Sequence, residues 1–264
     1  LRAENIIAAG DVGTPSTAAD VAPVWNKTIS ATDAPNCVGN KVTIEQLKRT
    51  PAEWNNETPQ CWPLVFYRRD FASKVLPPLC YRFVVKIPAN FADVIDNPGT
   101  RGWMEIFATK GTENNSTNQH RLSIHLIRES GESGIRIYVR FDLFNKRMDG
   151  TTISGSGLEL LWGMMSAEGA IVPGNYYDFF LYFDQRVDRS DLTGVTKILV
   201  IDKSTNAIAY QDSKTGVPTC GYDQASVGRI YMCGLYTGGF PSSGTITMEY
   251  SGCQIWDSMP VVLL

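Results

Sequence analysis

Several side chains near the middle of the chain combine groups that bind anions with groups that move protons. In residues 121–126 and 135–143 every second side chain is apolar, and the side chains between them are polar or charged. The polar set consists of Arg121, Ser123 and His125 in the first stretch and Arg136, Tyr138, Arg140 and Asp142 in the second. Arginine suits a carboxylate, whereas histidine and tyrosine suit proton transfer. The pattern predicts a polar sheet surface for an anionic, hydroxyl-rich ligand.

A hairpin is the element that would bring these groups onto one surface. The link Glu129–Gly134 is rich in glycine and serine, which form turns. Two antiparallel strands joined there would place the polar groups of both strands on the same face.

The rest of the chain also predicts strands separated by turn residues such as Asn97-Pro98-Gly99 and Pro173-Gly174. Their spacing, without helical stretches between them, predicts an all-β fold, an antiparallel β-sandwich of the jelly-roll type. The predicted strands are Leu64–Phe71, Cys80–Ile87, Trp103–Thr109, Arg121–Arg128, Ile135–Phe144, Leu158–Met164, Tyr176–Asp184, Thr196–Asp202, Ala207–Gln211, Arg229–Leu235 and Thr245–Trp256.

Residues 1–60 alternate poorly and are rich in Ala, Pro, Thr, Asn and Asp. We expect them to form an irregular N-terminal arm held by disulfides at Cys37 and Cys61, with a short helix at Thr43–Leu47. The jelly-roll domain would then occupy residues 61–264.

Composition narrows the class of protein. The net charge of −3, with no dominant basic segment, argues against a partner bound by bulk electrostatics, such as nucleic acid. No stretch approaches the ~20 apolar residues of a membrane span, so we expect a mature, soluble product, a monomer without a membrane partner.

The cysteines point to an oxidising compartment. There are six, an even number, and no close CxxC pair is present, which predicts disulfides in a secreted protein. Glycosylation sequons begin at Asn26, Asn56, Asn114 and Asn115 and fit a secreted glycoprotein.

Three parts of the chain resemble a known group of proteins. The segments are YRFVVKIPANF at 81–91, PGNYYDFFLYF at 173–183 followed by GVTKILVID at 194–202, and GLYTGG at 234–239 followed by ITMEYSGCQIW at 246–256. They resemble strands of jelly-roll polysaccharide lyases of the alginate and glucuronan lyase kind and of laminin-G-like lectins. This resemblance implies a concanavalin A-like sandwich with a concave sheet that binds carbohydrate.

The resemblance also implies an activity, the cleavage of an acidic, uronate-containing polysaccharide by β-elimination. The lyases of this group remove the proton at C5 of a uronate and expel the oxygen at C4. The residues that would act on the proton and the carboxylate are Tyr138, His125 and Arg140. Those that would hold the substrate are Arg121, Ser123, Arg136, Arg101 and Lys110. No metal or other cofactor is required.

Other functions fit parts of the same pattern. The polar face could be a solvated surface, or Tyr138 could stack on sugar rings in a non-catalytic lectin. The N-terminal arm could instead dock onto a neighbour in an extracellular assembly. Glu105 and Glu159 offer carboxylates for a glycoside hydrolase, which we consider weaker because no E-x-D-x-x-E arrangement is present. The acidic loop 184–191 could hold Ca²⁺, although its interleaved arginines favour salt bridges.

Overall fold

A computed structural model describes the chain over residues 3–5, 27–30, 41–46, 64–70, 78–91, 102–113, 117–144, 146–154, 158–186, 188, 190–221, 227–237 and 246–256. Side chains are described within 78–91, 102–109, 111, 120–144, 146–154, 158–186, 188, 190–221 and 249–250.

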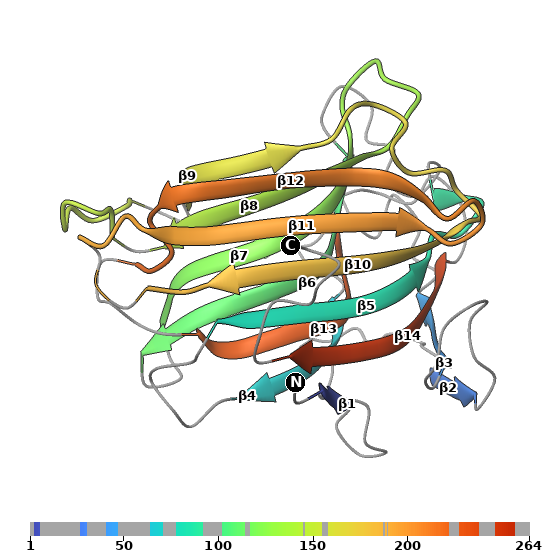
Figure 1. Ribbon diagram of the computed structural model, residues 1–264, viewed down its shortest axis with the longest axis horizontal. Helices are drawn as coiled ribbons and strands as arrows, with labels where there is room; N and C mark the ends of the chain where they lie inside the picture. Colours follow the sequence, from blue (N-terminus) through green and yellow to red (C-terminus); the bar gives the residue numbers. More distant parts are fainter. Residues whose placement is uncertain are drawn as a thin grey trace, which may run out of the picture.

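The strands of this part of the chain form two antiparallel sheets that lie face to face (Figure 1). The eight-stranded sheet has the order β12-β11-β10-β5-β14-β3-β2, with β1 also paired to β14. Its strands are β1 (Ala3–Asn5), β2 (Lys27–Ser30), β3 (Lys41–Gln46), β5 (Leu79–Lys86), β10 (Tyr176–Asp184), β11 (Gly194–Asp202), β12 (Ala207–Val217) and β14 (Ile246–Trp256).

The six-stranded sheet has the order β4-β13-β6-β7-β8-β9. Its strands are β4 (Leu64–Asp70), β6 (Gly102–Glu113), β7 (Thr117–Arg128), β8 (Arg136–Phe144), β9 (Leu158–Met165) and β13 (Val227–Thr237). Every strand predicted between residues 64 and 256 has a counterpart in one of the two sheets. The predicted antiparallel sandwich is confirmed.

Aromatic rings fill the space between the sheets. Phe83 of β5 stacks on Phe179 of β10 with ring centroids 5.1 Å apart. The Phe83 ring also lies parallel to that of Phe107 of β6, with centroids 5.9 Å apart, so the contact crosses from one sheet to the other. All three side chains are fully or almost fully buried. Because rings of this size dominate the apolar area removed from water, they fix the separation of the sheets.

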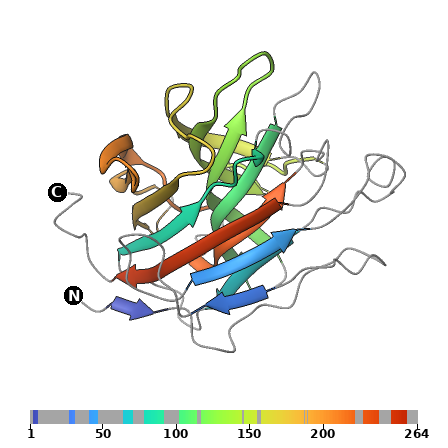
Figure 2. The same ribbon diagram turned by 90° about the vertical axis from the view of Figure 1, so that its right-hand side faces the viewer.

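Part of the N-terminal region belongs to the sandwich. The helix predicted at Thr43–Leu47 is wrong, because Lys41–Gln46 is strand β3, which pairs with β2 and with β14. Val42 and Ile44 lie opposite Tyr250 and Met248. Two β-branched side chains in alternation suit a strand better than a helix. Figure 2 shows β3 beside β14, and β2 lies next to β3 at the edge of this sheet.

The disulfide prediction fails for one cysteine. Cys80 of β5 carries a free, buried thiol, and burial raises its pKa to about 12. Cys37 and Cys61, the predicted anchors of the arm, lie outside the described residues. A search of the described residues finds no helix with the length and hydropathy that a membrane span needs.

Candidate functional site

The register of β7 and β8 brings the predicted polar groups together. His125 lies directly opposite Tyr138, and Ser123 lies directly opposite Arg140. Directly paired residues of an antiparallel ladder share a face, with Cβ atoms about 5 Å apart. The opposite face of both strands carries core residues such as Ile124 and Val139. The sequence prediction of one shared polar face is therefore confirmed.

The β7 half of this face is buried, which differs from the prediction that Arg121, Ser123 and His125 lie on an open surface where they contact substrate. Arg121 is 7%, Ser123 0% and His125 4% exposed. Charged groups withdrawn from water need partners. The structure supplies two buried carboxylates, Glu105 of β6 and Asp142 of β8.

Asp142 connects the two arginines of the cluster. Its carboxylate accepts a hydrogen bond from Nη2 of Arg121 at 3.2 Å and another from Nε of Arg140 at 2.9 Å. The other terminal nitrogen of Arg121 lies 3.0 Å from Oε2 of Glu105. The four side chains form a continuous chain of ion pairs in which two positive and two negative charges alternate. This chain of ion pairs holds the guanidinium of Arg140 in place at the edge of the cluster that solvent reaches.

His125 sits at the other end of the buried cluster. Its Nε2 lies 2.9 Å from Oγ of Ser123 and 3.4 Å from Oε2 of Glu105. Burial lowers the pKa of His125, and the neighbouring Glu105 only partly opposes this effect. We therefore expect a neutral imidazole at neutral pH.

These contacts do not make a nucleophilic triad. In such a triad one ring nitrogen faces the serine and the other faces the acid. Here Ser123 and Glu105 both contact the same nitrogen of His125.

Tyr138 and Arg140 form the part of the cluster that solvent reaches. Both are half-buried, and the side chain of Arg140 is 21% exposed. The guanidinium carbon of Arg140 lies 5.8 Å from the centre of the Tyr138 ring. The guanidinium at this position makes a cation–π contact with the ring, so the phenol and the positive charge lie side by side on the part of the site that solvent reaches.

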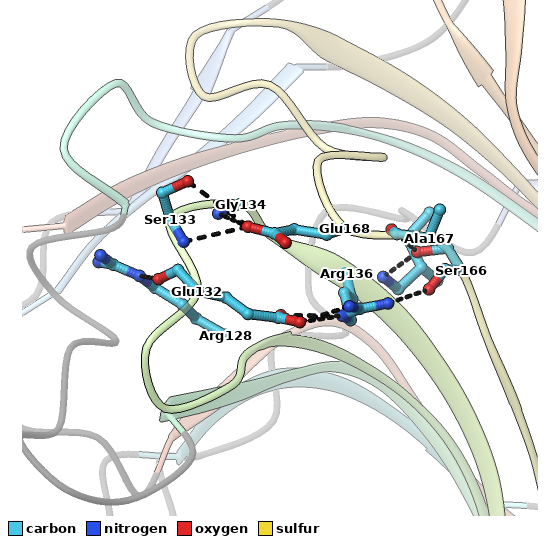
Figure 3. A network of polar contacts seen from close by, with 9 residues as sticks. Arg128, Glu132, Ser133, Gly134, Arg136, Ser166, Ala167 and Glu168 are labelled. Carbon is cyan, nitrogen blue, oxygen red and sulfur yellow. Dashed lines mark hydrogen bonds and ion pairs between the residues drawn. The ribbon is translucent and has the colours of Figure 1, made fainter.

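Arg136 contacts the hairpin turn at Glu132 and the turn after β9 at Ser166 (Figure 3). Its Nε and Nη2 donate to the carboxylate of Glu132, and its Nη1 donates to the carbonyl of Ser166 at 3.0 Å. Arg136 is four residues from Arg140, which is ~13 Å along a strand. The structure therefore ties Arg136 to the hairpin turn, and its charge is balanced by Glu132.

A second carboxylate, that of Glu168, also binds the hairpin turn between β7 and β8. Oε1 of Glu168 accepts from the backbone N–H groups of Ser133 and Gly134, at 3.1 and 2.9 Å (Figure 3). The hairpin turn between β7 and β8 is thereby joined to the turn that follows β9.

Two predicted substrate contacts are not resolved to the same depth. Arg101 lies outside the described residues. Lys110 belongs to β6, where its backbone lies opposite Arg121, and its side chain lies outside the described residues.

Glu105 and Asp142 are the site residues to which the sequence interpretation gave no role in a lyase: it placed Asp142 on the polar face and considered Glu105 only for hydrolysis. Asp142 continues the alternation of Tyr138 and Arg140, and this was a usable signal. Glu105 lies opposite His125 in the register of β6 and β7, which no local pattern predicts.

The carboxylate pair considered for hydrolysis is not assembled. Glu105 and Glu159 lie on β6 and β9, three strand spacings apart, or ~14 Å. Glu105 is paired with Arg121, and Glu159 lies 3.4 Å from Arg147. A glycoside hydrolase needs its two carboxyl groups at about 5 to 10 Å.

In the acidic loop 184–191, considered above for Ca²⁺, the carboxylates are paired largely with groups of the same segment. Nη2 of Arg186 donates to Asp184 at 2.7 Å. Asp188 and Asp191 each accept hydrogen bonds from a residue two positions later in their own turns, Ser190 and Thr193. Within the part of the chain that the structure describes, no cluster of three or more His, Cys, Asp or Glu side chains suits a metal ion.

His120 faces the core and is a structural residue. Its Nδ1 accepts a hydrogen bond from the backbone N–H of Gly221 at 3.1 Å, and its ring stacks on Phe141. Full burial lowers its pKa from 6.5 to about 3.

This buried imidazole predicts acid sensitivity. Below pH 6.5 His120 is protonated in the unfolded chain, whereas in the folded chain it stays neutral down to its lowered pKa of about 3. The free energy of unfolding therefore falls as the pH drops through this window, by up to about 1.4 kcal/mol per pH unit from this group. Urea unfolding at several pH values should show a shallower fall in His120→Asn than in the wild type. NMR signals of the His120 ring that titrate near pH 6 would contradict the assignment.

Comparisons with known proteins agree with the fold. No family model matches the chain, and no curated protein matches it. Among solved structures, the marine PL-14 alginate lyase from Aplysia kurodai superposes with a TM-score of 0.52 at 12% identity, covering 87% of this chain and 86% of that one.

Two further structures are similar at a lower level. The alginate lyase vAL-1 from Chlorella virus gives a TM-score of 0.47 at 13% identity, over 88% of this chain and 89% of that one. A GH131 β-glucanase catalytic domain from Podospora anserina gives 0.38 at 13% identity, over 91% and 87%. The likeness to the Aplysia protein shows a shared fold, and the sandwich implied by the sequence resemblance to jelly-roll lyases is confirmed at that level.

Proposed function

We propose that this chain is a secreted polysaccharide lyase that cleaves an acidic, uronate-containing polysaccharide by β-elimination. The observation that carries the proposal is the placement of Tyr138 opposite His125 and beside Arg140, on one face of the six-stranded sheet. The fold shared with an alginate lyase supports it, because the same sandwich hosts this chemistry in that protein.

The reaction assigns a separate task to each exposed group. Arg140 binds the uronate carboxylate and neutralises its charge, which makes the proton on C5 more acidic. Tyr138, as phenolate, takes that proton, and the bond between C4 and the glycosidic oxygen breaks as the C4=C5 double bond forms. The protonated Tyr138 then returns the proton to the leaving oxygen. Neither water nor a cofactor enters the balance.

The buried groups support these two. His125 lies behind Tyr138 as a neutral hydrogen-bonding group, with Ser123 against its ring nitrogen. Arg121 holds Asp142, which in turn holds Arg140. Arg136 would have to release Glu132 before it could bind substrate, so Arg140 is the main ligand of the carboxylate in this proposal.

The direct test is the appearance of unsaturated uronate, which absorbs in the ultraviolet. We expect absorbance to rise on at least one of alginate, glucuronan, pectate and glycosaminoglycans, without added metal and in the presence of a chelator. If absorbance stays flat on all four, the enzyme proposal fails.

A non-catalytic carbohydrate-binding protein is the second candidate. It is favoured by the pairing of Arg121 and Arg140 with buried carboxylates, which balances much of the positive charge that an acidic polymer would seek. This candidate predicts binding to glycans on an array without the formation of any product.

A further inference from the structure

We propose that Gly163 is a positioning residue for Tyr138, and that the missing side chain on β9 is what allows the phenol to reach its working position. This inference rests on the lyase proposed above, but its structural part can be tested without any activity.

The space beside Gly163 is already taken by the tyrosine. A Cβ placed on Gly163 would lie 2.6 Å from Cε2 of Tyr138 and 2.9 Å from its hydroxyl oxygen. Contacts this short are strongly repulsive. Any residue other than glycine would therefore displace the ring of Tyr138 or shift β9.

The register explains why the two residues meet. Gly163 lies directly opposite Arg140, and Tyr138 lies directly opposite Met165. Tyr138 and Gly163 are thus diagonal neighbours on the outer face, at a separation that an aromatic side chain can span. The ring leans across the ladder toward Gly163.

Backbone conformation does not account for a glycine at this position. The glycines with positive φ among the described residues are Gly131, Gly150, Gly169, Gly174 and Gly216. Gly163 is not among them, so an L side chain would meet no backbone strain. Glycine inside a strand weakens it by roughly 0.5–1 kcal/mol relative to alanine, and close approach of another group is a common reason for it. Here that group is the reacting phenol.

The outward-facing positions of β9 on either side of Gly163 carry large side chains, so the space at Gly163 is a local feature of the strand. Leu160, opposite Asp142, and Met165 both carry large side chains that are nearly half exposed. The opening is formed by the absent side chain of Gly163 alone, because the atoms nearest to a Cβ placed there all belong to Tyr138. The ring that lies in it is approached from β8 by the guanidinium of Arg140, which Asp142 holds. The orientation of the hydroxyl therefore depends on Gly163 as well as on the cations.

The first arm of the experiment is kinetic. Gly163→Ala should lower kcat about 10- to 100-fold, because a displacement of about 1 Å at a reacting group has an effect of this size. The KM should stay within about threefold, because Arg140 still binds the carboxylate. Leu160→Ala, a change on the same strand that leaves the opening intact, should keep the wild-type kcat within about threefold.

The second arm needs no substrate. The ring signals of Tyr138, assigned by comparison with Tyr138→Phe, should shift in Gly163→Ala and stay in place in Leu160→Ala. Gly163→Ala should also lower the Tm in the wild-type background but not in a Tyr138→Ala background, where the added methyl group finds open space.

The two arms separate the possible failures. Equal changes in Tm in both backgrounds, or unmoved Tyr138 signals, would overturn the role of Gly163. If the wild type cleaves no uronate polymer but the ring coupling is found, the lyase proposal fails and the role of Gly163 in placing Tyr138 stands.

Discussion

Tyr138→Phe is expected to reduce kcat by about 10³-fold while substrate binding stays within about threefold of the wild type. The change removes the hydroxyl that carries the proton from C5 to the leaving oxygen. It keeps the ring, so the contact with Arg140 and the fit over Gly163 are preserved. Initial rates of ultraviolet absorbance measure the loss, and titration calorimetry with a resistant oligosaccharide measures the binding.

Tyr210→Phe is the matched control for this change. The Tyr210 hydroxyl donates to Asp212 at 3.0 Å on β12, in the other sheet, so its loss should leave kcat unchanged. If Tyr138→Phe retained rates within about tenfold of the wild type, another group would be the base and the assignment of Tyr138 would be wrong.

Asp142→Asn is expected to destabilise the protein by about 3 kcal/mol. The carboxylate is fully buried and is shared by Arg121 and Arg140, so neutralising it leaves both guanidiniums short of a negative partner. Arg121 keeps only its contact with Glu105 among the carboxylates that the described residues bring to it. Urea unfolding measures the loss, and a rise in KM should accompany it because Arg140 is no longer held in place.

Asp178→Asn offers a comparison with the same chemistry elsewhere. Asp178 is buried on β10 and accepts two hydrogen bonds from Arg82, at 3.0 and 2.8 Å, in the eight-stranded sheet. It should also lower stability but leave KM unaltered. An Asp142→Asn protein as stable as the wild type would show that the ion-pair chain contributes little, and an equal rise in KM in both variants would show an indirect effect.

The sequence predicted the reactive face because alternation along β7 and β8 is a local property. Leu122 and Ile124 mark the core side of β7, and Ser123 and His125 must then share the other side. The burial of that other side could not be predicted. It depends on Glu105, which reaches His125 through a pairing between β6 and β7 that no single strand reveals.

Two other features show the same limit. The sequence predicts a helix at Thr43–Leu47 rather than the strand at Lys41–Gln46 because β14, which pairs with this strand, lies some two hundred residues further along the chain. The contact between Gly163 and Tyr138 could not be predicted from the sequence. A bulge between Phe141 and Asp142 shifts the register of β8 and β9, so counting residues from the loop between these strands gives the wrong partner. Arg136, by contrast, stands four residues after Glu132, a spacing that could have suggested their ion pair across the turn.

The order of the strands has a consequence for biosynthesis. The last of the described strands, β14, lies between β5 and β3, and the strand before it, β13, lies between β4 and β6. Before the ribosome has made Val227, the six-stranded sheet lacks β13 and the eight-stranded sheet lacks β14. The backbone groups of β4, β5 and β6 that pair with these strands are then free to pair with other chains. The nascent protein therefore cannot close this sandwich until residues 227–256 have left the exit tunnel. A chain that terminates early should aggregate rather than persist as a smaller folded unit.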